Sequence, residues 1–94
     1  MKAANDKLSL ALRAVADPTR RKILRLLRSK PGTKGLCASQ VEQRIKLAQP
    51  TVSHHMKILR QAGLVETSKV GTWVHYKRNE AALRRMRTAL AEEI

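Results

Sequence analysis

Apolar side chains recur with a helical period between residues 48 and 65, AQPTVSHHMKILRQAGLV. Val52, Met56 and Leu59 follow the i, i+4, i+7 spacing, which predicts a helix buried along one side. Pro50 suits the first turn of a helix and Gly63 suits its exit. The opposite side is polar and contains no carboxylate; it carries Gln49, Ser53, His54, Lys57, Arg60 and Gln61.

The same periodicity predicts two helices near the N-terminus. The first runs from Asp6 to Ala16 with an apolar stripe, and it ends before Pro18 because the residue preceding a proline avoids helical angles. The second runs from Pro18 to about Ser29. Its buried face is predicted to be Ile23, Leu26 and Leu27. Its arginines are predicted to lie outward or along the surface: Arg20, Arg21, Arg25 and Arg28.

A short third helix is predicted to precede the central one. The segment Lys30–Gly35 contains one proline and two glycines and no apolar residue, so it is predicted to be a loop, and the next two residues a short strand. Ser39 is then expected to cap a helix that buries Val41 and Ile45. Glu42 stands three residues after Ser39, in the position of a capping box.

Only three residues, Lys46, Leu47 and Ala48, separate these two helices. Two helices joined by so tight a turn, the second of them polar outside, are typical of a helix-turn-helix, in which the second, the recognition helix, enters the major groove of DNA. Donors and acceptors without carboxylates can bind base edges and phosphates. A helical hairpin of an ordinary bundle shares the spacing, so spacing alone does not decide for DNA.

The character of the sequence changes after Gly63. The stretches Leu64–Val70 and Thr72–Arg78 are rich in β-branched and aromatic residues and are separated by Gly71, which predicts an antiparallel hairpin with its tip at residues 69–72. Such a wing can reach the flanking minor groove or phosphates, here through Lys69 and Thr72. Its aromatic residues, Trp73 and Tyr76, are predicted to pack against the domain, because duplex DNA exposes few base faces.

Asn79 is predicted to cap the last helix, which places four apolar side chains on one stripe: Leu83, Met86, Leu90 and Ile94. A core of three helices and a hairpin is too small to bury the stripes of both the first and the last helix. We therefore expect these two helices to pair with their copies in a two-fold homodimer. Such a dimer holds two recognition helices about 34 Å apart, which predicts an inverted-repeat operator.

Composition supports a polyanionic partner. The chain has 94 residues, predicted to form a single domain, and 20 Lys and Arg against 7 Asp and Glu give a formal charge of +13. The alternatives are a merely soluble basic surface or membrane binding, but a long apolar run, a signal peptide and interfacial aromatics are all missing from the sequence. We expect a cytoplasmic protein. One cysteine, Cys37, excludes an internal disulfide and is compatible with a reducing compartment.

Three motifs in this order resemble the ArsR-type winged-helix repressors over nearly the whole chain: ADPTRRKILRLL (residues 16–27), QPTVSHHMKILRQAGLV and GTWVHYKRN. The resemblance implies a homodimeric bacterial or archaeal transcriptional repressor, often an autorepressor, with helix-helix-helix-helix-strand-strand-helix topology. In the family, groove contacts come from the polar face of the recognition helix. That face maps here onto Gln49, Thr51, Ser53, His54 and Lys57.

The chain departs from the metal-sensing members of that family. Many carry a Cys-Val-Cys pair where this chain has Cys37, Ala38 and Ser39, and one thiol cannot complete a site of three or four ligands. Others use His and carboxylates of the last helix, which here has no histidine. We therefore predict no metal site and no cofactor, and an effector would be a small molecule or a protein. A metal shared between subunits, or a redox response of Cys37, is the alternative.

The three histidines are predicted to have separate roles. His54 points away from the buried stripe and is the candidate for DNA contact, whereas His55 lies near the stripe and is expected to pack with a hydrogen-bonded ring. His75 is expected to be a cross-strand neighbour in the hairpin.

Two other classes of function are a protein- or RNA-interaction module and an enzyme. A protein- or RNA-interaction module would use the same basic surface. The low number of aromatic residues argues against single-strand binding, because such binding relies on base stacking. An enzyme is not predicted, because the sequence has no local cysteine–histidine pair, no glycine-rich phosphate loop and no paired carboxylates in an apolar setting.

Overall fold

The computed structural model of the protein describes residues 6–28 and 35–94. The predicted loop falls outside these residues except for Gly35. The elements follow in the order α1 (Lys7–Val15), α2 (Pro18–Leu26), β1 (Leu36–Cys37), α3 (Ala38–Ile45), α4 (Gln49–Gln61), β2 (Val65–Val70), β3 (Trp73–Arg78) and α5 (Glu80–Glu93). This confirms the predicted order of helices and hairpin, with β1 as the short strand before α3.

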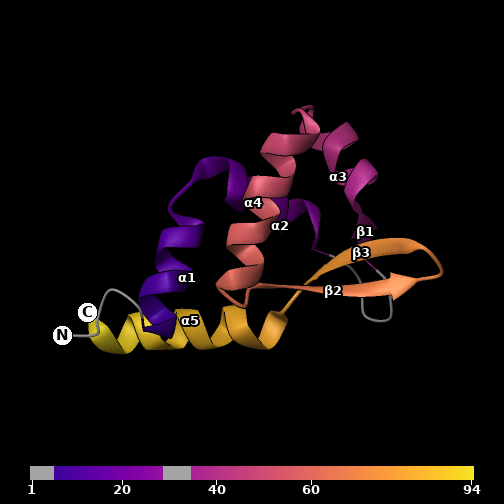
Figure 1. The fold of residues 1–94 in the computed structure, drawn as a ribbon. Coiled ribbons are helices and arrows are strands. Elements are labelled where there is room, and N and C mark those ends of the chain that lie inside the picture. The colour runs from indigo at the N-terminus through magenta and orange to yellow at the C-terminus, as the bar shows by residue number, and fades with distance from the viewer. Residues whose placement is uncertain (1–5, 29–34) are drawn as a thin grey trace.

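The molecule has two distinct ends. Figure 1 shows α4 crossing the middle of the fold, α1 and α5 side by side at one end, and the hairpin of β2 and β3 extending away at the other. The side chains that α4 presents between these ends are therefore flanked by the wing on one side and by the pair α1 and α5 on the other.

Three helices begin with a side chain that accepts a backbone N–H. Asp6 accepts from Ser9 N at 2.7 Å, and Asp17 accepts from Arg20 N at 3.0 Å. These bonds favour the charged carboxylates and lower the pKa of both. Asn79 accepts from the third residue of α5 at 3.0 Å, as predicted for the last helix.

The predicted start of α3 is wrong. The residue before the helix is Cys37 rather than Ser39, and the Cys37 N–H donates to Gln40 Oε1 at 2.9 Å, so Glu42 takes no part. The reason lies in the sheet: Leu36 and Cys37 pair with β3, which fixes the chain in extended form up to the first helical residue. The Ser39 side chain instead lies beside sulfur, with Oγ 3.2 Å from Cys37 Sγ.

The three strands form an antiparallel sheet in the order β1-β3-β2. Val70 pairs with Trp73, so the hairpin loop is only Gly71 and Thr72, and Gly71 has the positive φ of 64° that such a turn requires. Two predictions shift by a few positions. Thr72 lies in the turn rather than in the second strand, and Lys69 lies within β2, opposite Val74.

The core confirms the predicted stripe of α4: Val52, Met56 and Leu59 are each at most 2% exposed. In α2 the prediction is partly wrong, because Leu24 is buried with Ile23 and Leu27 while Leu26 is half-buried. In α1 only the alanines of the inner face are buried; the larger side chains Leu8, Leu12 and Val15 remain half-exposed. The prediction for α2 differs from the structure at Leu24 and Leu26. The reason is that α2 has neighbours on more than one side, whereas the prediction assumed a single buried stripe.

Candidate nucleic-acid interface

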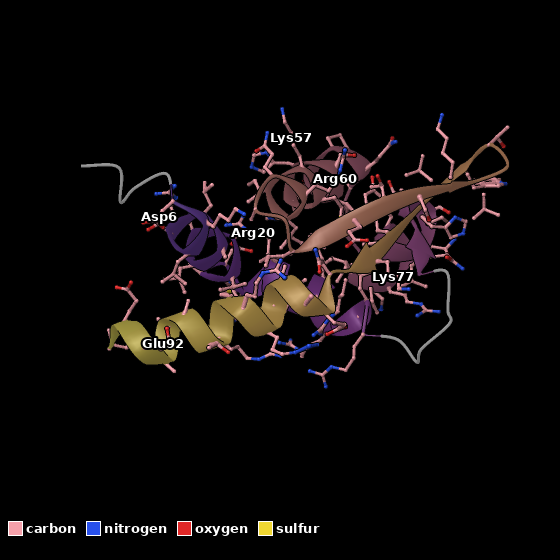
Figure 2. All side chains as sticks on the ribbon, turned by 90° about the horizontal axis from the view of Figure 1, so that it is seen from below. Asp6, Arg20, Lys57, Arg60, Lys77 and Glu92 are labelled. Atoms are coloured by element: carbon pink, nitrogen blue, oxygen red, sulfur yellow. The ribbon has the colours of Figure 1, made fainter. Side chains whose placement is uncertain are left out.

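The outer face of α4 is exposed over its whole length. All of the predicted contacts lie at the surface of the structure: Gln49, Thr51, Ser53, His54, Lys57 and Arg60 on α4, and Lys69 and Thr72 on the hairpin. Ser53, Lys57 and Arg60 follow the i, i+4, i+7 spacing, so they form one stripe opposite the core. Figure 2 shows Lys57 and Arg60 projecting from the same side of α4.

The turn before α4 holds it against α3. Lys46 has a φ of 62°, and its N–H donates to Glu42 O at 2.8 Å, which closes α3 in a left-handed cap. Three residues later α4 begins at Gln49, with Pro50 in its first turn, where a missing N–H leaves no hydrogen bond unmade. The short turn and the shared core contacts of Val41 and Val52 leave α4 little freedom to move relative to α3.

A groove separates the second half of α4 from β2. It is lined by Lys57, Arg60, Gln61, Val65, Glu66 and Thr67. The helix contributes two cations and an amide, and β2 contributes a carboxylate. The prediction of a carboxylate-free helix therefore holds for α4 itself, but the neighbouring strand adds one negative charge to the groove, and Gln61 joins the predicted contacts at its edge.

Arg20 corrects the prediction of an outward-pointing arginine. Its Nε donates to Ala14 O at 2.7 Å and its Nη2 to Arg13 O at 3.2 Å, so it satisfies carbonyls at the end of α1. Its Nη1 lies 3.3 Å from Nδ1 of His55 on α4. Figure 2 shows Arg20 between these two helices. One guanidinium on α2 thus joins the end of α1 to α4.

The aromatic residues of the hairpin divide into two cases. Tyr76 packs against the core, as predicted. Trp73 does not: it is 63% exposed, and the prediction that it packs against the domain is wrong. Trp73 stands next to the two-residue turn, and among the described residues it belongs neither to the buried core nor to the side chains packed against it.

Known proteins share this arrangement. Residues 17–67 match the family described as "Bacterial regulatory protein, arsR family". This chain belongs to the arsR family. It is 41% identical over 71 residues to an uncharacterised HTH-type transcriptional regulator of Methanocaldococcus jannaschii, covering 76% of each chain. It is 35% identical over 71 residues to the transcriptional repressor SdpR of Bacillus subtilis, covering 76% of this chain and 74% of that one.

A solved structure agrees with the fold. The homodimeric winged helix-turn-helix DNA-binding domain from Mycobacterium bovis superposes with a TM-score of 0.73 at 24% identity, covering 97% of this chain and 82% of that one. The arsR-family chain is thus a winged helix-turn-helix DNA-binding regulator.

His55 is the predicted packing histidine, and its contact with Arg20 confirms that role. Burial holds the pKa of His55 below its ordinary value; the Asp17 carboxylate opposes this effect and the Arg20 guanidinium adds to it. The neutral ring leaves Nδ1 free of a proton when Nε2 carries it, and Nδ1 then accepts from Arg20. A protonated ring would instead place two cations 3.3 Å apart.

We expect the arsR-family protein to lose stability as the pH falls below about 6.5, because the unfolded chain protonates His55 before the folded chain does. Chemical denaturation at several pH values measures this loss. His55→Gln should flatten the dependence between about pH 7 and pH 5, whereas His54→Gln, on the exposed neighbour, should retain it. Asp6 and Asp17 have lowered carboxyl pKa values, so their protonation affects stability only at more acidic pH. An unchanged slope in His55→Gln would refute the assignment.

Cys37 and His75 lie beside each other in the sheet. They are paired positions on β1 and β3, and His75 also pairs with Ser68, which confirms it as a cross-strand neighbour. The Ser39 hydroxyl beside the sulfur lowers the pKa of the Cys37 thiol, and the Gln40 backbone adds to this. Among the described residues no three His, Cys, Asp or Glu side chains gather as metal ligands would. A redox role of Cys37 stays a prediction.

Within residues 6–28 and 35–94, no helix combines the length and the apolar run that crossing a membrane would need.

Proposed function

We propose that this arsR-family regulator is a homodimeric repressor that binds an inverted repeat in duplex DNA. The observation that carries the proposal is the division of α4 into two faces. Its inner stripe is at most 2% exposed, and its outer face is polar, cationic and free of carboxylates. A helix sealed on one side and basic on the other suits the major groove, where phosphates line both edges.

The proposed contacts divide by position. Gln49, Ser53, His54 and Lys57 are placed to contact base edges from α4, with Thr51 at its first turn. Cationic side chains outside this set supply phosphate contacts that carry affinity rather than sequence preference. These are Arg60 at the end of α4 and Lys69 in the hairpin, with Thr72 beside it in the turn.

Apolar side chains left uncovered on α1 and α5 support the dimer. Leu12 and Leu90 are half-exposed, and Ile94 is 97% exposed. A hollow of about 430 Å³ lies between these helices and the end of α4, with Leu8 and Met86 among its lining residues. In the proposed dimer the partner's apolar side chains fill this hollow. The related domain from Mycobacterium bovis is a homodimer, and the related SdpR is a repressor.

This proposal treats the whole chain as one DNA-binding domain that acts in the cytoplasm, where the DNA of a prokaryote lies. Selection from a random duplex pool is its first test, and the expected result is a dyad-symmetric sequence with half-sites about one helical turn apart. The binding constant should fall steeply with salt, with each neutralised phosphate contributing about −0.9 to the slope. Bound sequences without a dyad would contradict the dimer.

Ser53→Ala and His54→Ala are each expected to weaken binding to the selected site by about 1 to 3 kcal/mol and to leave random DNA nearly unaffected, because they remove contacts to bases. Titration of labelled duplexes measures both affinities. Thr88→Ala, on the exposed side of α5, is the matched control and should change neither. Equal losses on the selected and the random duplex would show that α4 does not carry the sequence preference.

A further inference from the structure

The tip of the hairpin carries an apolar patch in open solvent. Trp73 is 63% exposed and Val74 is 37% exposed, and Val70, the cross-strand partner of Trp73, is half-buried. Tryptophan offers a large apolar surface that is costly to leave in water, and monomeric proteins seldom place it at a protruding tip. The patch therefore indicates a surface that a partner covers.

The hairpin holds this patch at a fixed place away from the core. Its base is anchored: Val65 is buried, and Arg78 donates to Leu24 O at 3.2 Å and pairs with Glu80 at 2.9 Å. Its outer half extends past the helices (Figure 1). In Figure 2 the end of the hairpin and the labelled Lys57 of α4 lie toward the same side of the view, away from α5.

The charge around the patch suits a polyanion. The sequence from residue 67 to residue 77 contains no carboxylate and two lysines. Lys69 lies directly across the hairpin from Val74. A protein partner would need about 800 Å² of buried surface on each side with an apolar centre, which one indole and two valines do not supply.

We propose that Trp73 is a DNA-contacting residue that enters the minor groove beside the sequence contacted by α4. This inference rests on the proposed function. The walls of the minor groove are sugar rings that present apolar surface, and apolar side chains inserted there can part a base step without needing an unpaired base. Trp73 thereby gives the wing an apolar contact in addition to the phosphate contacts of Lys69 and Thr72.

The contact also makes the flanking sequence matter. Opening a base step costs least at flexible pyrimidine–purine steps, so sites flanked by TA or CA steps bind more tightly than sites flanked by stiff A-tracts. This preference arises outside the bases that α4 reaches, and it disappears when the indole is removed.

The indole reports on its own contact, because Trp73 is the one tryptophan in the chain. The selected duplex, carrying a dye that does not absorb tryptophan emission, is titrated into the protein. Dye anisotropy follows binding, and tryptophan emission with acrylamide quenching follows Trp73. We expect a shift to shorter wavelength and a quenching constant lowered at least about twofold, since an indole held against DNA is shielded from solvent.

The two signals separate the two proposals. Binding by anisotropy with unchanged tryptophan emission overturns the role of Trp73 and leaves the proposed function standing, whereas no binding at all overturns the proposed function. A single-stranded oligonucleotide that alone alters the emission also overturns the inference, because stacking on unpaired bases would then explain the exposure.

Substitution supplies an independent measurement. Trp73→Thr keeps a residue suited to a strand and is expected to lower affinity for a TA-flanked site about tenfold, equal to about 1.4 kcal/mol, with Trp73→Phe recovering most of the loss. Val74→Thr is the matched control for loss of apolar surface at the same tip. Thermal unfolding should stay unchanged in all three, because the tip makes no core contact. Wild-type affinity and flank preference in Trp73→Thr would overturn the proposal.

Discussion

Lys57→Glu is expected to lower the affinity of the dimer for its selected duplex at least about a hundredfold, the largest binding effect that we expect from one substitution. Lys57 lies in the middle of the exposed stripe, between Ser53 and Arg60. The substitution removes a cation that is proposed to contact DNA and puts a carboxylate in its place. Each bond to a charged group contributes about 1.5–3 kcal/mol, and a dimer loses two of them.

The matched control is Lys22→Glu, the same chemical change on the exposed side of α2. Both variants have the same net charge, so long-range repulsion is common to them and is screened beyond about 10 Å at moderate salt. We expect Lys22→Glu to weaken binding only a few-fold, and the difference between the two variants gives the local effect at Lys57. Equal losses would mean that total charge, rather than the face of α4, governs binding.

Gly35→Ala is expected to destabilise the fold by at least about 3 kcal/mol, through left-handed strain and a steric clash together. Gly35 has a φ of 85°, and a Cβ at this position would stand 2.1 Å from Tyr76 O. The carbonyl belongs to the backbone of β3, so it cannot move aside without breaking the pairing of β1 with the hairpin. Denaturant unfolding measures the loss.

Gly71→Ala separates the two causes. Its φ of 64° imposes similar left-handed strain, but nothing lies within 4 Å of a Cβ at that position. We expect a loss of about 1 to 2 kcal/mol, the cost of the backbone conformation alone. Should both variants lose the same stability, the close approach of Gly35 to β3 would not contribute to the fold.

Most of α4 could be predicted from the sequence because one helical spacing of apolar residues shows which side of the helix is buried. The stripe of Val52, Met56 and Leu59 is buried, and Gly63 takes a positive φ of 76° at the exit. In an amphipathic helix, the periodicity of the apolar residues indicates the buried side. The predicted DNA contacts of α4 are exposed for the same reason, because they occupy the helix positions outside the buried stripe.

The features that could not be predicted from the sequence depend on contacts between residues that are distant along the chain. Arg20 belongs to an arginine-rich face, and only the position of α1 and His55 shows that its guanidinium is held by three partners. Trp73 alternates correctly for a strand, but alternation does not tell where a hairpin leaves the core. The cap of α3 depended on the pairing of Cys37 with β3, which no local pattern encodes.

Net charge pointed to the right class of partner without locating it. The exposed side of α2 is as basic and as free of carboxylates as that of α4, with Arg21, Lys22 and Arg25, and Arg28 follows the helix. The turn between α3 and α4 therefore predicts which face binds DNA, and the charge of +13 only supports that prediction.

The pairing of β1 with β3 makes the wing one part of a three-stranded sheet rather than a free arm. A two-stranded hairpin is marginally stable by itself. A wing that became ordered only when it bound DNA would lose conformational entropy at each binding event. Here that entropy has already been lost during folding. Association should therefore proceed as a nearly rigid docking, with a small entropic penalty from the hairpin and a dissociation rate set by the contacts themselves.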